Sequence, residues 1–397
     1  MRVHHHFITH CFCALTLAAV AASPAFAEKA VPIGFITTLS TPAGYLGQDE
    51  RDGFMLAVKE EGGKLGGIPV DVRIEDDGLK PASAKLTVDR MLQEGIKLFT
   101  GINFSNVMMA VGPSVIGAKA FYISNNAGPA AFAGKNCSPY FFGAAFQNDT
   151  FADTVGFVAN EIGAKKAVIM VPNYQAGRDA AEGFKKTFKG QIVGETYTSL
   201  DQTDFAVAMA QIRSAKPEVV FEFEPGGLGI AFLRQYQQAG LLKDVPMVVH
   251  SASLDQVTAQ AIGDAAVGVN LTSHWNDDFD NPPNKAFVAA WRAKYGDRPI
   301  TYYAAQGYDA ALLVGAGLAK DPASANDPAA FRKAVLSADV PSVRGPFKFG
   351  PNQHPIQDWY ALKAEKAADG KVALKTTGKV LTAHGDQYAA LCKMPAN

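Results

Sequence analysis

Short apolar segments alternate with helical patterns over the first part of the chain. Strand-like runs lie at residues 31–38, 68–77, 96–101 and 120–124, and helical patterns lie at about 51–61, 81–95 and 105–118. Apolar runs bounded by turn residues are typical of buried strands, and the longer amphipathic stretches between them are typical of crossover helices. This order predicts an α/β fold in which helices cover both faces of a parallel sheet.

The same alternation begins again further along the chain. Strands are expected at 166–171, 191–198, 218–224, 246–250 and 267–272. Helices are expected near 176–189, 204–215, 227–240, 253–262, 285–295, 302–320 and 328–338. Two strand-like segments in the tail, 357–365 and 371–380, need a sheet edge to join. We therefore predict two doubly wound sheets.

The first residues have the layout of an export signal. Arg2 precedes the apolar run CALTLAAVAA, which is followed by Pro24 and an A-x-A site at residues 25–27. We expect cleavage after Ala27 and a periplasmic mature protein. The apolar run is shorter than the roughly 20 residues that a membrane span requires.

Charge and composition exclude some partners. The chain has 37 Lys+Arg against 38 Asp+Glu, and removal of Arg2 with the leader leaves 36 against 38, a net charge of about −2. This balance favours neither nucleic acid nor an anionic membrane surface. A length of 397 residues with 48% hydrophobic residues suits two domains with large cores.

Two cysteines, Cys137 and Cys392, remain after the leader. An even count in an oxidising compartment predicts one disulfide, which would pin the C-terminus to the body of the protein. The alternative is two buried free thiols.

The sequence shows no strong signature of an enzyme or a cofactor. The motifs G-x-x-x-x-G-K-[ST], H-E-x-x-H and G-x-S-x-G do not occur. His250, His274, His354 and His384 lack the spacing of a metal site, so we expect structural or surface roles for them. Ser251 next to His250 does not make a nucleophile–base pair, so a hydrolase is poorly supported.

Two strand-to-loop junctions, INFSN (102–106) and ISNNAG (123–128), suggest a binding site. The carboxyl ends of parallel strands border the ligand crevice of an open sheet. Ser105 can cap the following helix, and backbone N–H groups of both loops can hold an anion without Arg or Lys. Capping without a ligand is the alternative for either loop alone.

The order of these elements, with TTLSTPAGYLGQDERDGFMLAVKEEGG, the two junctions, NYQAGRDAAEGF and FEPGGLGIAFLRQYQQAGL, resembles the leucine/isoleucine/valine-binding family of periplasmic solute-binding proteins. These are class I binding proteins of ABC importers. The resemblance implies two Rossmann-like lobes of the Venus-flytrap type, joined by a three-strand hinge. It places the first lobe at residues 28–147 plus 274–351 and the second at 148–273 plus 352–397.

The resemblance also implies ligand-facing positions. A ligand carboxylate would be held by Ser105 and the backbone near Asn126 and Gly128, and Tyr45 would form an aromatic wall of the cleft. Phe104 and Trp275 are further aromatic residues near expected cleft positions. The positions implied for the second lobe are Tyr174, Gln175, Glu224, Pro225 and Ser251.

One departure from the family bears on the ligand. Amino-acid binders of this type place an acidic residue in the loop after the strand at 246–250, where this chain has SAS (251–253) and then Asp255, expected inside a helix. An ammonium group without an anionic partner would cost several kcal/mol in a closed cleft. We therefore expect a carboxylate without the amine. The aromatic residues near the expected cleft resemble those of family members that bind aromatic carboxylates, which implies an acid of the benzoate or cinnamate type. Whether Glu224, His274 or Arg51 contacts the ligand is left open.

The sequence thus predicts a monomeric periplasmic protein, not an enzyme and without cofactor or metal, that captures a small carboxylate for a membrane ABC permease. The alternative within the family is a branched-chain or other amino-acid binder in which Glu224 replaces the missing acid. Rivals from other classes are an amide- or urea-sensing regulator and a secreted hydrolase.

Overall fold

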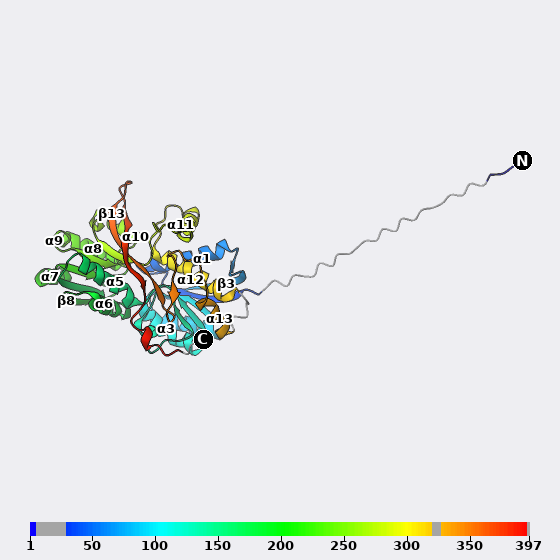
Figure 1. The fold of residues 1–397 in the computed structure, drawn as a ribbon, viewed down its shortest axis with the longest axis horizontal. Helices are drawn as coiled ribbons and strands as arrows, with labels where there is room; N and C mark the ends of the chain where they lie inside the picture. The colour runs from blue at the N-terminus through cyan, green and yellow to red at the C-terminus, as the bar shows by residue number, and fades with distance from the viewer. Residues whose placement is uncertain (5–28, 320–326, 395–397) are drawn as a thin grey trace.

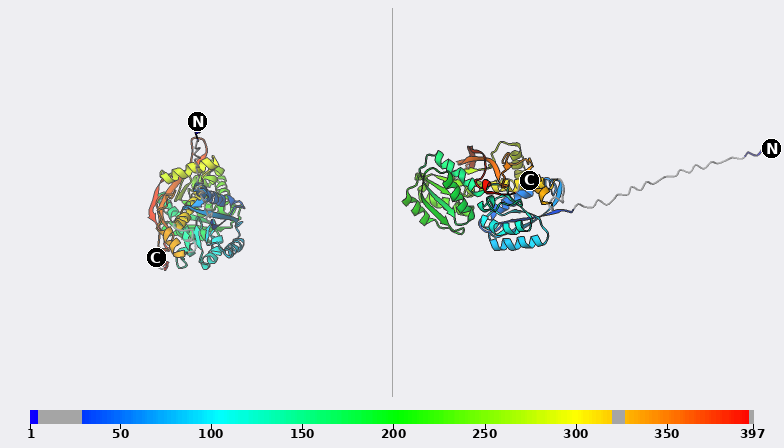
Figure 2. Two further views of the ribbon diagram at one scale, coloured as in Figure 1. Left: turned by 90° about the vertical axis from the view of Figure 1, so that its right-hand side faces the viewer. Right: turned by 60° about the horizontal axis from the view of Figure 1, so that its bottom comes forward.

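The computed structural model describes residues 1–4, 29–319 and 327–394 of the chain. The cleavage site predicted after Ala27 lies outside these residues. In the described part the chain forms two sheets of mostly parallel strands, each covered by helices, as predicted (Figure 1). The two units lie side by side in the right-hand view of Figure 2, and we call them the first lobe (blue and cyan) and the second lobe (mainly green).

The first lobe is built on a six-stranded sheet in the order β2-β3-β1-β4-β5-β6. Its strands are β1 (Val31–Thr37), β2 (Lys64–Leu65), β3 (Ile68–Asp76), β4 (Leu98–Gly101), β5 (Phe121–Ser124) and β6 (Phe141–Gly143). All pairs are parallel except β2 with β3. The helices of this part are α1 (Gly44–Glu60), α2 (Pro81–Gln93), α3 (Ser105–Gly117), α4 (Ala130–Ala133), α11 (Pro282–Tyr295), α12 (Tyr302–Leu318) and α13 (Pro328–Leu336).

The second lobe contains an eight-stranded sheet in the order β12-β13-β11-β10-β9-β7-β8, with β14 paired to β13. Its strands are β7 (Lys166–Pro172), β8 (Gln191–Thr198), β9 (Val219–Glu222), β10 (Met247–His250), β11 (Asn270–Ser273), β12 (Lys348–Phe349), β13 (Pro355–Lys366) and β14 (Val372–His384). Its helical segments are α5 (Asn148–Glu161), α6 (Gln175–Thr187), α7 (Ala206–Ala215), α8 (Gly227–Gln238), α9 (Leu241–Asp244), α10 (Gln256–Ile262), η1 (Gly263–Ala266) and η3 (Ala389–Leu391). The two tail strands join this sheet because β13 pairs antiparallel with β11.

The chain passes between the two sheets more than once. It leaves the first sheet after β6 and enters α5, which packs against α6, β10 and β11. It leaves the second sheet after β11 for α11 and α12, and α12 packs along α1. It returns through Gln353, whose carbonyl accepts a hydrogen bond from Gly143 N–H of β6 at 3.0 Å, into β13. That these passages act as a hinge stays a prediction.

Apolar contacts join the two lobes. The largest core cluster includes Ile36 and Phe99 of the first sheet together with Ile169 and Phe221 of the second. Phe151 of α5 belongs to this cluster, with ring centroids 3.7 Å from His250 and 4.9 Å from Trp359. Apolar residues of both sheets therefore share one core cluster.

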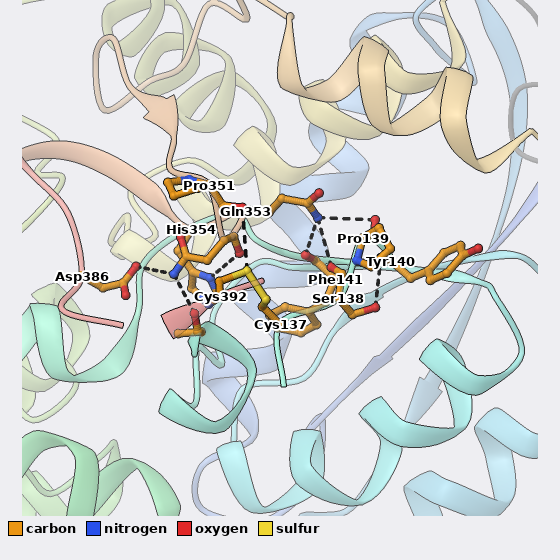
Figure 3. The surroundings of a disulfide bond; sticks show 12 residues. Cys137, Ser138, Pro139, Tyr140, Phe141, Pro351, Gln353, His354, Asp386 and Cys392 are labelled. Atoms are coloured by element: carbon orange, nitrogen blue, oxygen red, sulfur yellow. Dashed lines mark hydrogen bonds between the residues drawn. A yellow bond between two sulfur atoms is a disulfide. The ribbon is translucent and has the colours of Figure 1, made fainter. Parts of the chain in front are cut away.

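The predicted disulfide is confirmed. Cys137 and Cys392 are bonded through their Sγ atoms and are 255 residues apart in sequence (Figure 3). The loop beside Cys137 is held by Gln353, whose Nε2 donates to Phe141 O at 2.7 Å. The tail before Cys392 contacts the second lobe, where Gln387 Nε2 donates to Asp149 Oδ2 of α5 at 2.9 Å. The C-terminal segment is thus attached to both lobes.

Several elements differ from the prediction: the short α4, α9, β2, β6 and β12 were not expected, and two longer helices differ as well. Helix α1 begins at Gly44 and not near residue 51, because glycines allow its first turns to lie against the end of β1: a Cβ at Gly47 would be 2.1 Å from Thr38 O. Helix α5 was not predicted at all. Most of its residues are buried, including polar ones such as Asp149 and Thr154, so its sequence has no single apolar stripe.

Candidate functional site

A cavity lies between the lobes where strands of both sheets end. Its volume is about 30 Å³. Its wall consists of Leu46, Asn103, Phe104, Ser105, Asn126, Phe146, Asn148, Tyr174, Ala176, Ala180, Phe223, Pro225, His250, Ala252, Tyr302 and Tyr303. A larger hollow of about 660 Å³ adjoins this cavity and shares Phe104 and Pro225 with it. The wall is mainly aromatic and small apolar, with a few polar groups, as is typical of small-molecule sites.

On the first-lobe side, the beginning of α3 offers hydrogen-bond donors. Phe104 is the N-cap residue and has extended backbone, and its carbonyl accepts from Val107 and Met108 N–H at 3.0 Å. The N–H groups of Ser105 and Asn106 precede the first intrahelical bond, and they have no acceptor within the described residues. They form a partial positive charge at the edge of the cavity.

Ser105 lines this cavity but does not cap the helix, so that expectation was wrong. Its Oγ accepts a hydrogen bond from Asn148 Nδ2 at 3.1 Å. The same Asn148 accepts at Oδ1 from Gly128 N–H at 3.1 Å and donates to Asp179 at 2.9 Å. Asn148 therefore ties the two strand-to-loop junctions together.

The second junction presents fewer free donors than expected. Asn126 lines the cavity, but its Nδ2 donates to Gln306 Oε1 at 2.9 Å. The N–H group of Gly128 is engaged by Asn148. A Cβ at Gly128 would lie 2.1 Å from Phe146 O, so this position requires glycine for close backbone packing.

Aromatic side chains from both lobes form much of the remaining wall. Tyr174, the N-cap residue of α6, lies with its ring centroid 6.1 Å from that of Phe104 and 6.2 Å from that of Phe223. Tyr302 and Tyr303 begin α12, with ring centroids 4.1 Å apart. Burial raises the pKa of both hydroxyls well above the usual range, so both stay protonated. Such walls suit a flat apolar ligand body.

The carboxyl groups of the second lobe lie beside the cavity and do not line it. Glu224 is fully buried, its Oε1 accepts from Thr198 Oγ1 at 2.6 Å, and its Oε2 has no partner in the described residues. Burial raises the pKa of Glu224 to about 8. Asp255 was expected inside a helix, but it is the N-cap residue of α10. Burial raises its pKa to about 7. Its Oδ1 accepts from Thr258 N–H and its Oδ2 from Tyr45 Oη, both at 2.8 Å.

Several predicted site residues lie outside the wall. Gln175 donates through Nε2 to Asp179 Oδ1 at 2.7 Å, and Ser251 donates to Thr272 O. Trp275 donates through Nε1 to Asn284 Oδ1 at 2.7 Å. Ser251 and Trp275 border a separate small hollow near Asp255. Of the predicted residues, the structure brings Phe104, Ser105, Asn126, Tyr174 and Pro225 together around the cavity, while Tyr45, Gly128 and Glu224 do not line it.

The two other residues whose position was left open do not line the cavity either. Arg51 forms an ion pair with Asp52 at 2.7 Å. His274 borders a small hollow beside Arg344 and Gln306, at the passage from the second sheet to the first.

Sequence reasoning missed His250, Asn148, Tyr302 and Tyr303, which all line the cavity. The position of His250 at the end of the strand PMVVH could have identified it, because that is the edge where ligands bind. Asn148 and the tyrosine pair carry no such signal, since they begin helices distant in sequence from the junctions.

Two further properties of the described residues concern metal binding and membrane spans. Within residues 1–4, 29–319 and 327–394, no group of three or more His, Cys, Asp or Glu side chains is arranged to hold a metal ion. None of the helices in those residues has the length and hydrophobicity to cross a bilayer.

The fold and the cavity between its lobes agree with a family match. The family model of the periplasmic binding proteins matches residues 30–371, so the chain belongs to the periplasmic binding protein family. Members that resemble it are solute-binding proteins of ABC transporters, and this chain is one of that kind.

Particular relatives differ in the ligands that they are named for. The chain is 29% identical to Leu/Ile/Val-binding protein homolog 6 of Brucella melitensis over 371 residues, 90% of this chain and 93% of that protein. A solute-binding protein of R. palustris solved in complex with benzoate has a TM-score of 0.86 and 30% identity, over 92% of this chain and 100% of that chain. Another from R. palustris, in complex with 4-hydroxybenzoate, has a TM-score of 0.83 and 29% identity, over 90% and 98%.

Proposed function

We propose that this protein captures a small aromatic carboxylate, such as a benzoate-like acid, between its lobes and delivers it to a membrane ABC permease. The proposal includes export with cleavage after Ala27, action as a monomer in the periplasm, and closure about the passages between the sheets. We also propose the lobe boundaries predicted from the sequence. The first lobe would comprise residues 28–147 plus 274–351, and the second would comprise residues 148–273 plus 352–397.

One observation carries the ligand class: the cavity has free donors for an anion and no free ionised carboxylate for an amine. Ser105 and Asn106 N–H lie at the positive end of α3. Asp255 is already bonded to Tyr45 and Thr258, and Glu224 is protonated at neutral pH because its pKa is raised to about 8. A zwitterionic amino acid would bury its ammonium group without a counter-charge.

The aromatic wall supports a ring as the ligand body. Phe104, Tyr174 and Phe223 form one continuous aromatic surface at centroid distances near 6 Å. The related structures in complex with benzoate and 4-hydroxybenzoate support the same class by analogy.

A branched-chain amino-acid binder is the second candidate, and it is favoured by the names of the curated relatives. It requires that Asp255 give up its bond to Tyr45, or that Glu224 ionise, when the ammonium group enters.

Calorimetric titration of ligand-free protein tests the proposal. Because a co-purified ligand would mask binding, the protein is unfolded, dialysed and refolded without reductant so that the Cys137–Cys392 bond stays intact. We expect benzoate and hydroxybenzoates to bind, and leucine and valine to bind at least about 100-fold more weakly, a difference of about 2.7 kcal/mol. Tight binding of leucine with no response to aromatic acids would contradict the proposal.

A further inference from the structure

His250 lies buried in the cavity wall, and no metal or catalytic site described above accounts for a histidine at this position. It is the last residue of β10, is 5% exposed, and forms part of the cavity wall. Its ring is enclosed by Phe151, with centroids 3.7 Å apart, and by Phe223, with centroids 4.6 Å apart. These two aromatic contacts restrict the orientation of the imidazole ring.

The backbone fixes which nitrogen carries the hydrogen. Ala252 N–H donates to His250 Nδ1 at 3.0 Å, so Nδ1 is an acceptor. A neutral imidazole with Nδ1 as acceptor carries its hydrogen on Nε2. Burial lowers the pKa of His250 to about 3, so the ring stays neutral at any physiological pH.

No acceptor for Nε2–H is found among the described residues, and Nε2 is not one of their fully enclosed polar atoms without a partner, so it is open to the cavity that His250 lines. N–H groups at such sites are nearly always hydrogen-bonded. A water or a ligand in the cavity can supply the acceptor.

We propose that His250 is a specificity-determining residue whose Nε2–H donates a hydrogen bond to an oxygen substituent on the ring of the ligand. The inference rests on the proposed function and narrows it from aromatic carboxylates to hydroxylated or otherwise oxygenated ones. The carboxylate lies at the start of α3, and the ring oxygen lies against the second lobe. An ammonium group has only donors, so the fixed N–H of His250 also disfavours an amine at this position.

The test compares ligands of equal shape. Binding of 3- and 4-hydroxybenzoate is measured by calorimetry against 3- and 4-methylbenzoate, in which a methyl group replaces the hydroxyl. We expect the wild-type protein to bind at least one hydroxybenzoate about tenfold more tightly than its methyl counterpart, as one neutral hydrogen bond provides. His250→Phe keeps the aromatic packing and should reduce this ratio to about one. His250→Gln, which restores an N–H donor, should recover part of the preference.

The outcomes separate this inference from the proposed function. Binding of benzoates without a preference for the hydroxyl, or a preference that survives His250→Phe, overturns the role of His250 and leaves the proposed function intact. Binding of leucine and of no aromatic acid overturns both. If His250→Phe does not fold, ¹⁵N NMR of the wild type decides: the Nε2–H signal should shift with the hydroxyl ligand and not with its methyl counterpart, and equal shifts contradict the inference.

Discussion

Tyr45 Oη donates a hydrogen bond to Asp255 Oδ2 at 2.8 Å across 210 residues of sequence. Tyr45 lies in the first turn of α1 in the first lobe, and Asp255 is the N-cap of α10 in the second lobe. This bond is a polar connection between the lobes, in addition to the bonds of Asn148 with Ser105 and Gly128, and it occupies Oδ2 of Asp255.

Removal of this bond should weaken the closed state. Tyr45→Phe deletes only the hydroxyl, and we expect ligand affinity to fall about 3- to 30-fold because a bond to a carboxylate made on closure is lost. Calorimetry gives the affinity and small-angle scattering gives the degree of closure. Tyr197→Phe is the matched control, since Tyr197 Oη donates to Glu195 at 2.6 Å on an exposed face. Equal effects of both changes would contradict a role in closure.

The anion site can be tested by removing one backbone donor. Ser105 is the first residue of α3, where proline is tolerated, and Phe104 before it has the extended backbone that proline requires (φ −104°, ψ 127°). Ser105→Pro removes the N–H group and should weaken carboxylate binding roughly 10- to 100-fold, measured by calorimetry. Ser105→Ala keeps the N–H group and serves as the control. If Ser105→Pro folds and binds like Ser105→Ala, the carboxylate lies elsewhere.

Stability should fall as the pH rises from about 6.5 to 8.5. The folded-state pKa values of Glu224 and Asp255 are raised to about 8 and about 7 from 4.5 and 3.8, so the folded protein holds protons that the unfolded chain has lost. Stability is therefore lost as pH increases through these values. His250, with a pKa lowered to about 3, acts in the opposite direction only below about 6.5, where the unfolded chain binds the proton.

A substitution isolates the contribution of Glu224. Glu224→Gln keeps a neutral side chain of the same shape. Between pH 6.5 and 8.5 the free energy of unfolding of this variant should fall by about 1–2 kcal/mol less than that of the wild type. Denaturant unfolding at several pH values measures it. Glu182→Gln, on an exposed helix face, should leave the pH dependence unchanged. A wild-type stability that rises over this range would refute the prediction.

The disulfide should contribute to stability without contributing to binding chemistry. Cys137→Ser with Cys392→Ser should lower the free energy of unfolding by about 2–4 kcal/mol. Reductant should destabilise the wild type by a similar amount and leave the double variant unaffected. Denaturant unfolding with and without reductant makes the comparison, and a wild type indifferent to reduction would contradict it.

The sequence predicted the alternation of elements, the two sheets and the disulfide, because each depends on local patterns or on residue counts. It did not reveal α5, because a helix buried on most sides has no amphipathic stripe. It also did not reveal that Asp255 begins α10, since the run SASLD contains several possible N-cap residues.

The cavity was predicted only in part. Phe104 and Ser105 were found because a strand ends beside them, which is a local signal. The engagement of Gly128 by Asn148 and the tautomer of His250 depend on contacts that only the folded chain creates. Residue type and position indicated where the site lies, and tertiary hydrogen bonds decide which donors remain for a ligand.

The Cys137–Cys392 bond has a consequence for biogenesis. Because the bond joins residues 255 positions apart, it can form only after synthesis has passed residue 392. A chain truncated before Cys392 would therefore lack the covalent link between this tail and the loop at Cys137.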